Sequence, residues 1–140
     1  MIKELLQPDS ARVVYDIRRD TVGLELMRNA SLSSGPGGVE LNHGLIGSQE
    51  WWSAIETGRL KLETFVGILR PVAGGMHGDT LKVYIEAEDK KQRWVAWRGF
   101  EPSLNGKKVC TRYVQMLPKK PLPSKPGFSI PVLLQVELFD

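Results

Sequence analysis

Apolar and polar residues alternate along most of the chain from residue 60 onward, which is the pattern of strands with one buried face. The alternation is clearest over Leu81–Ala87, where every second residue is apolar. The same pattern predicts four more strands, over residues 60–69, 92–98, 108–117 and 130–138. Pro71 is expected to end the first of these strands or to lie at a sheet edge. Residues 73–79 then form a glycine-rich loop.

A helix is predicted over Gln49–Thr57, just before the alternating region. Ser48 can cap its first turn by accepting a hydrogen bond from a free backbone amide. Gly58 can end the helix in the left-handed conformation. Trp51 or Trp52, with Ile55, would share the face that packs on the strands.

The first 30 residues leave two alternatives open. Val13–Ile17 is rich in β-branched and aromatic residues and predicts a strand. Val22–Met27 could pair with it as a second strand or form a short helix. We expect one domain over residues 1–140, in which an irregular N-terminal extension (1–44) packs on a helix and β-barrel (45–140).

The predicted fold class is mainly β, within α+β. Five short strands bury one face most readily when they roll into a small barrel, which also hides the strand edges. Gly67, inside the first long strand, suits the bend that a barrel corner needs. The strand count favours an OB-like or SH3-like barrel and does not separate the two.

The segment Gly47-Ser48-x-x-Trp51-Trp52-x-x-Ile55-x-x-Gly58 resembles a pattern in small bacterial proteins that have no assigned activity. The resemblance extends over about residues 45–117. It implies a bacterial, cytoplasmic origin and no particular chemistry.

Composition is that of an ordinary folded domain, with 140 residues and 41% hydrophobic side chains. Cys110 is the single cysteine, so a disulfide within the chain is excluded. Apolar runs are too short for a membrane helix, and the first residues lack the apolar core of a signal peptide. These features predict a cytoplasmic protein without a membrane partner.

Charge is distributed unevenly along the chain. Residues 1–57 carry five basic and eight acidic side chains, whereas residues 58–140 carry fourteen basic and eight acidic ones. Within 90–125 ten bases face a single acid, Glu101. Such a cluster is typical of an anion-binding surface, although lysines also protect strand edges in ordinary proteins.

Aromatic residues lie among these bases over residues 84–125, as on barrels that stack bases and neutralise phosphates. Trp94 and Trp97 are three residues apart and should point to opposite faces of a strand, so at least one should be partly exposed. The candidate site for single-stranded nucleic acid or another polyanion comprises Tyr84, Arg93, Trp97, Arg98, Lys107, Arg112, Lys119 and Lys120.

A small enzyme is a further alternative, with His43, His77, Asp79 or Cys110 as reactive groups. The spacing of these residues matches no zinc signature, and Cys110 has no CxxC partner. Cys110 lies in the middle of a predicted strand, where a buried, inert thiol is expected. We therefore expect no metal, no cofactor and no catalytic residue.

The leading hypothesis is a non-enzymatic binding module whose partner is another protein or an identical subunit. The C-terminal strand has an inward apolar set from Ile130 to Leu138 and a second apolar face with Leu133 and Phe139. That second face needs cover, which either the N-terminal segment or a second copy could provide. A homodimer is therefore a specific expectation.

Overall fold

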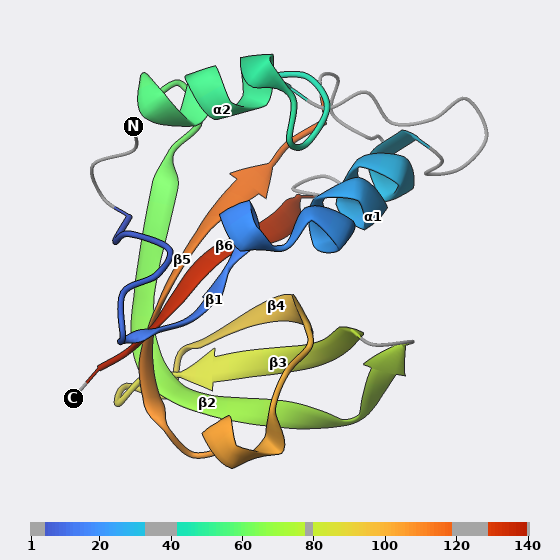
Figure 1. Ribbon diagram of the computed structural model, residues 1–140. Helices are drawn as coiled ribbons and strands as arrows, with labels where there is room; N and C mark the ends of the chain where they lie inside the picture. Colours follow the sequence, from blue (N-terminus) through green and yellow to red (C-terminus); the bar gives the residue numbers. More distant parts are fainter. Residues whose placement is uncertain (1–4, 33–41, 78–79, 119–128, 140) are drawn as a thin grey trace.

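The computed structural model describes residues 5–32, 42–77, 80–118 and 129–139 (Figure 1). Within these residues the fold is mainly β, as predicted. None of the described helices is long and apolar enough to cross a membrane. The elements are β1 (Val13–Asp16), the 3-10 turn η1 (Ile17–Arg19), α1 (Thr21–Leu32), α2 (Gln49–Glu56), β2 (Leu62–His77), β3 (Thr80–Glu86), β4 (Gln92–Arg98), the 3-10 turn η2 (Pro102–Leu104), β5 (Lys108–Met116) and β6 (Ile130–Leu138).

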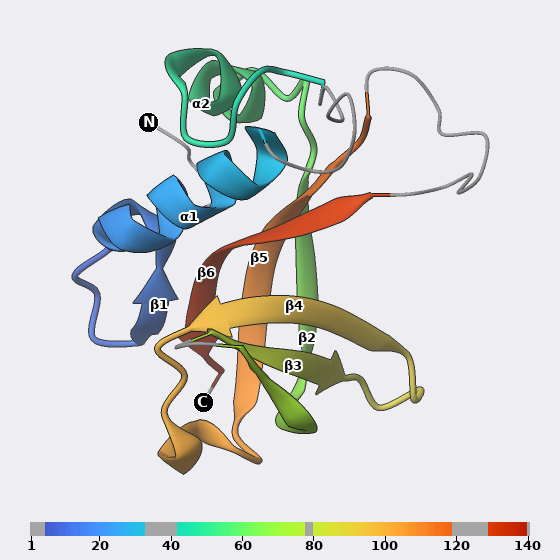
Figure 2. The ribbon, with the colours of Figure 1, turned by 90° about the vertical axis from the view of Figure 1, so that its right-hand side faces the viewer.

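The described strands form one antiparallel sheet in the order β1-β6-β5-β2-β3-β4. The expected closed barrel is absent from this sheet, because β1 and β4 remain its two ends. The sheet instead bends sharply along β2, so that β4 crosses over β6 (Figure 2). Trp97 of β4 and Leu133 of β6 pack in the same apolar cluster at this crossing. Side-chain packing therefore replaces the hydrogen bonding that would close a barrel.

The first long strand continues through Pro71, where we expected an end or an edge. The Leu69 amide donates to the Lys107 carbonyl, just after β5 has ended its pairing with β2. Pro71 lies two residues after Leu69, so its nitrogen points to the same side of β2 as the Leu69 amide. At Pro71, β5 no longer runs along that side. Its other neighbour, β3, stays paired with it through Val83. Pro71 thus lies at a local sheet edge, and the strand includes residues that we expected to form a loop.

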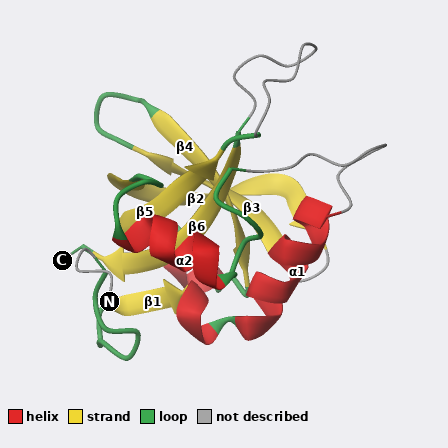
Figure 3. Ribbon diagram, turned by 90° about the horizontal axis from the view of Figure 1, so that it is seen from above, coloured by secondary structure: helices red, strands yellow, loops and turns green. Residues whose placement is uncertain are grey.

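Two apolar clusters fill the bent sheet. The first lies beneath the helices and includes Trp51, Ile55 and Met116. The second lies inside the fold of the sheet and includes Leu69, Trp97 and Leu133. Both helices lie over the same end of the sheet (Figure 3). Tyr15 packs against both clusters and so links the two halves of the core.

The predicted α2 helix is confirmed together with its caps. Ser48 accepts a hydrogen bond from the Trp51 amide at 3.2 Å, and Gly58 adopts a φ of 78°. Trp51 is completely buried, and its indole nitrogen donates to the sulfur of Met116 at 3.1 Å. The undecided segment after β1 is a helix, α1, whose Leu24 and Met27 pack on the first cluster.

The strict alternation expected along β6 is wrong in its second half. A bulge between β5 and β6 pairs Arg112 with Gln135 and Tyr113 with Leu133. Leu134 therefore falls in the first cluster and Val136 in the second, although they are two residues apart. Leu133 is only 4% exposed, so it no longer requires a second copy of the chain as cover.

The N-terminal segment is fixed to β6 by a buried polar network around Gln135. The side-chain oxygen of Gln135 accepts a hydrogen bond from the backbone amide of Leu6, and its side-chain nitrogen donates one to the Leu6 carbonyl, both at 3.0 Å. The same side-chain nitrogen also donates to the Asp16 carboxylate at 2.7 Å. Arg18 pairs with the same Asp16 carboxylate and donates to the Leu6 carbonyl. Each buried polar group here is matched by a partner, as burial requires.

Trp51→Ala is expected to lower the free energy of unfolding by about 3–5 kcal/mol, because it opens a cavity in the first cluster. Trp52→Ala, at the half-buried neighbour on the same helix, should cost clearly less. Urea unfolding followed by circular dichroism measures both. Equal losses at the two positions would show that α2 does not close the core through Trp51.

Candidate interaction site

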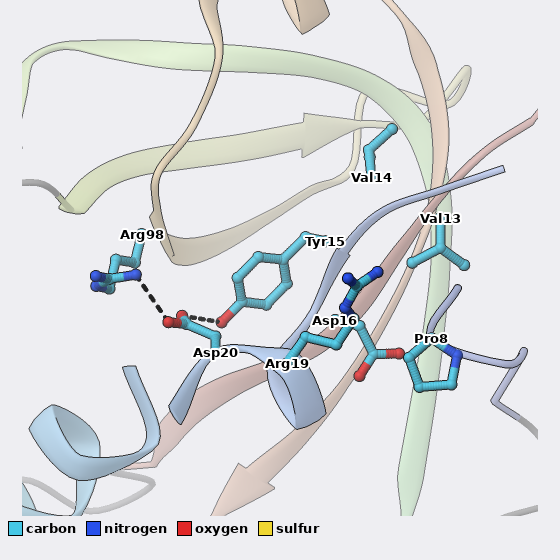
Figure 4. Close-up of a pocket in the computed structure, with 8 residues that line it drawn as sticks. All are labelled: Pro8, Val13, Val14, Tyr15, Asp16, Arg19, Asp20 and Arg98. Atoms are coloured by element: carbon cyan, nitrogen blue, oxygen red, sulfur yellow. Dashed lines mark hydrogen bonds and ion pairs between the residues drawn. The ribbon is translucent and has the colours of Figure 1, made fainter. Parts of the chain in front are cut away.

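A pocket of about 290 Å³ opens between β1, η1 and the end of β4. Tyr15, Asp20 and Arg98 line it from these three parts of the chain (Figure 4). The same three residues line a smaller hollow of about 60 Å³ between α1, β4 and β6. One polar cluster therefore forms a shared wall of two neighbouring depressions.

Asp20 is the centre of this cluster. One carboxylate oxygen accepts from the Arg98 guanidinium at 2.8 Å and from the Gly23 amide at 3.0 Å. The other accepts from the Tyr15 hydroxyl at 3.0 Å. Figure 4 shows the carboxylate between the arginine and the tyrosine. A single side chain thus joins β1, the start of α1 and the end of β4.

The local sequence explains this position of Asp20. Its backbone amide donates to the Ile17 carbonyl and ends the η1 turn, and its side chain caps the first turn of α1. An aspartate at such a position accepts a hydrogen bond from a backbone amide that has no partner within the helix. Its negative charge also interacts favourably with the positive end of the helix dipole. Gly23 leaves the room for it, because a Cβ at this position would collide with the Asp20 carboxylate.

Tyr15 remains a protonated hydrogen-bond donor in this setting. Burial, and then the nearby charge of Asp20, raises the pKa of Tyr15 far above its ordinary value. The hydroxyl is therefore held in one orientation by Asp20. This arrangement gives the pocket a fixed shape and polarity, which suits recognition of a partner.

The predicted polyanion site is divided among separate environments. Trp97 is only 2% exposed, and it packs against Tyr15 and Phe100 in the core, so it cannot stack on a base. Arg98 is held by Asp20. Arg112 pairs with Glu137 at 3.0 Å and is mostly covered.

The remaining predicted residues lie apart from one another. Arg93 donates to the Tyr113 hydroxyl, Tyr84 lies half-buried on β3, and Lys107 is exposed after η2. Lys119 and Lys120 lie outside the described residues. Binding of nucleic acid through this set stays a prediction, and the described geometry does not gather the set into one face.

The proposed reactive residues are also separated in the described chain. Cys110 is buried, and this burial raises the pKa of its thiol. His43 lines a different pocket, near Arg59 and Lys61. Asp79 and the side chain of His77 lie outside the described residues. The described part of the chain holds no group of three potential metal ligands.

Asp20 and Tyr15 were missed in the sequence, where residues 18–21 indicated only a polar turn. The available signal was an aspartate three residues before Gly23, at the start of an apolar periodic segment. The sequence did predict that Trp94 or Trp97 would be exposed, and Trp94 is 43% exposed.

Comparison with models of known protein families finds a match for this chain. A family model described as immunity protein RhsI2 matches residues 11–96, which is more than half of the chain. No curated protein matches it. The matched range contains Tyr15 and Asp20 and ends two residues before Arg98.

Asp20→Ala is expected to reduce the free energy of unfolding by about 2–4 kcal/mol, because it removes a helix cap and leaves Arg98 and Tyr15 without their acceptor. Asp20→Asn keeps an acceptor at the cap and should cost less than half as much. Chemical denaturation of both variants measures the difference. An unchanged free energy of unfolding in Asp20→Ala would show that this carboxylate does not hold the three elements together.

Stability should decrease at high pH through Tyr15. The raised pKa means that the folded state keeps its proton where the unfolded state, with a pKa near 10, releases it. The contribution of Tyr15 to the unfolding free energy is therefore complete below about pH 10 and decreases as the pH rises further. Urea unfolding between pH 8 and 11 should show a shallower decline for Tyr15→Phe than for the unchanged chain. Identical slopes would exclude this linkage.

Proposed function

The chain belongs to the family of immunity protein RhsI2, and from this we propose that it is a non-enzymatic binding module that neutralises a toxin protein. An immunity protein protects a cell from a toxin. The simplest way for a module of this kind to act is to hold the toxin in an inactive complex.

The family match is the observation that carries this proposal. It covers β1, α1, α2, β2, β3 and most of β4. These elements supply β1, η1 and α1 to the walls of the two depressions. The matched range therefore includes most of the surface that the Asp20 cluster shapes.

The geometry supports binding without rearrangement. Asp20 already fixes α1 against β1 and β4, so these elements would lose little freedom on contact with a partner. A standard protein interface covers about 800 Å² on each partner. This is roughly a tenth of the chain's accessible surface of 8545 Å², so one face of the molecule is large enough.

The other expectations about location and partners stay predictions. A cytoplasmic location, a homodimer and binding of nucleic acid have support only from the sequence. A toxin as partner has the additional support of the family match.

The proposal predicts that this chain protects cells from a toxin domain and forms a stable complex with it. Genes that neighbour the gene for this chain are searched for a toxin domain, and the domain found is the probe, produced from an inducible promoter in a bacterial host. Coexpression should restore growth, and the two purified proteins should elute together from a size-exclusion column.

Two outcomes would contradict the proposal. The first is equal killing by the toxin domain with and without this chain. The second is restored growth without a detectable complex, which would point to an enzymatic mode of protection. An unrelated folded protein of similar size, produced from the same promoter, provides a control for nonspecific effects of expression.

A further inference from the structure

We propose that the toxin binds to a face formed by α1 and β4, here called the α1–β4 face, through an apolar side chain with acidic groups beside it. This inference rests on the proposed function and names the surface and the partner chemistry. The α1–β4 face consists of Val22 and Leu26 on α1, Trp94 and Ala96 on β4, and Lys82 on β3.

Exposed apolar side chains gather on this face. Val22 and Leu26 are each 50% exposed and Trp94 is 43% exposed. The other large apolar side chains with high exposure in the described chain are Leu117 and Phe139. Both lie outside residues 11–96, the range of the family match. Exposed apolar surface that is contiguous usually marks an interaction site.

The α1 and β4 side chains form one continuous surface. Leu26 and Ala96 line the same small hollow. Val22 lies one helical turn before Leu26, so the two share a helix face. Trp94 lies two residues before Ala96, so both point to the same side of the strand. In Figure 2, β4 crosses in front of β6 and below α1.

The hollow offers a seat for one apolar side chain of the partner. It measures about 60 Å³, and Met27 and Pro131 form apolar walls beside Leu26 and Ala96. Asp20 and Arg98 also line it and are already paired with each other. An aliphatic side chain could enter without leaving these charges unpaired.

Trp94 has the properties of a preformed anchor. It lies directly opposite Tyr84 on β3, with ring centroids 5.2 Å apart. The Lys82 ammonium lies 5.5 Å from the centroid of its ring. The indole therefore contacts two side chains of β3 and loses little freedom on binding. Tryptophan, tyrosine and arginine are the residues most enriched among binding hot spots.

Charge on this side of the sheet favours an acidic partner. Lys82 is exposed next to Trp94, and Arg70 lies exposed on β2 opposite Tyr84. Neither pairs with a carboxylate of the described residues. Glu86 nearby accepts from the neutral amide of Gln92, and the two cations outnumber this one carboxylate. Complementary charge guides a partner to a surface and fixes its orientation.

The test compares variants of this face in binding the same toxin domain, measured by isothermal titration calorimetry. Trp94→Ala and Leu26→Arg should each raise the dissociation constant at least 30-fold, the size expected for a hot spot. Ala96→Lys should block the hollow and weaken binding in the same way. Leu117→Arg is the matched control, since Leu117 is 49% exposed and lies off the face. It should bind as the unchanged chain does.

A charge variant tests the partner chemistry. Lys82→Glu should weaken binding about 10-fold at low salt and less at 0.5 M salt, because salt screens exposed charges. Unchanged or tighter binding by Lys82→Glu would overturn the acidic partner. Melting temperatures of all variants confirm that each is folded before its affinity is used.

The outcomes separate the two proposals. Failure of the unchanged chain to bind would reject the proposed function and this surface with it. Tight binding by the unchanged chain together with wild-type affinity for Trp94→Ala, Leu26→Arg and Ala96→Lys would reject only the surface. A dimer of the free chain that Leu26→Arg dissociates would assign the face to a second copy. Binding of a single-stranded oligonucleotide that Trp94→Ala abolishes would likewise overturn a protein partner.

Discussion

The arrangement of the elements that line the pocket depends on the hydrogen bonds of the Asp20 carboxylate. It accepts hydrogen bonds from Tyr15, Gly23 and Arg98, which belong to β1, α1 and β4. β4 is distant in sequence from the other two elements, and β1 and β4 form opposite ends of the sheet. Because no strand pairing joins these two ends in the described chain, the ion pair with Arg98 and the packing of Trp97 do so instead. The two depressions on either side of Asp20 are a direct consequence.

A second buried network secures the other side of β1. Gln135 lies completely buried on β6 and bonds both the Leu6 backbone and the Asp16 carboxylate. Asp16 and Asp20 flank the short η1 turn, so each end of that turn is fixed by a different network. The start of α1 is thereby held in place before any partner arrives. Such preorganisation lowers the cost of binding, which supports the proposed capture of a toxin.

The sequence was informative where one local rule decides the structure. Ser48 and Gly58 marked the ends of α2, and alternation located β3, β4 and most of β5 and β6. It was misleading where a distant contact decides. Pro71 is tolerated inside β2 only because β5 ends beside it, and Val136 departs from the alternation only because β6 bulges against β5. The Asp20 cluster depends on the approach of residues 78 positions apart, which composition and spacing do not reveal. The basic residues of the 90–125 region predicted one face, yet Arg98 and Arg112 are engaged by acids from other elements.

Amide hydrogen exchange tests most directly whether the toxin binds to the preformed α1–β4 face, as we propose. Exchange is measured by mass spectrometry on the free chain and on its complex with the toxin domain. We predict that added protection concentrates in peptides that cover α1 and β4, with little change over α2. Protection confined to residues 42–63 would contradict this proposal and place the interface around α2 and the pocket of His43 instead.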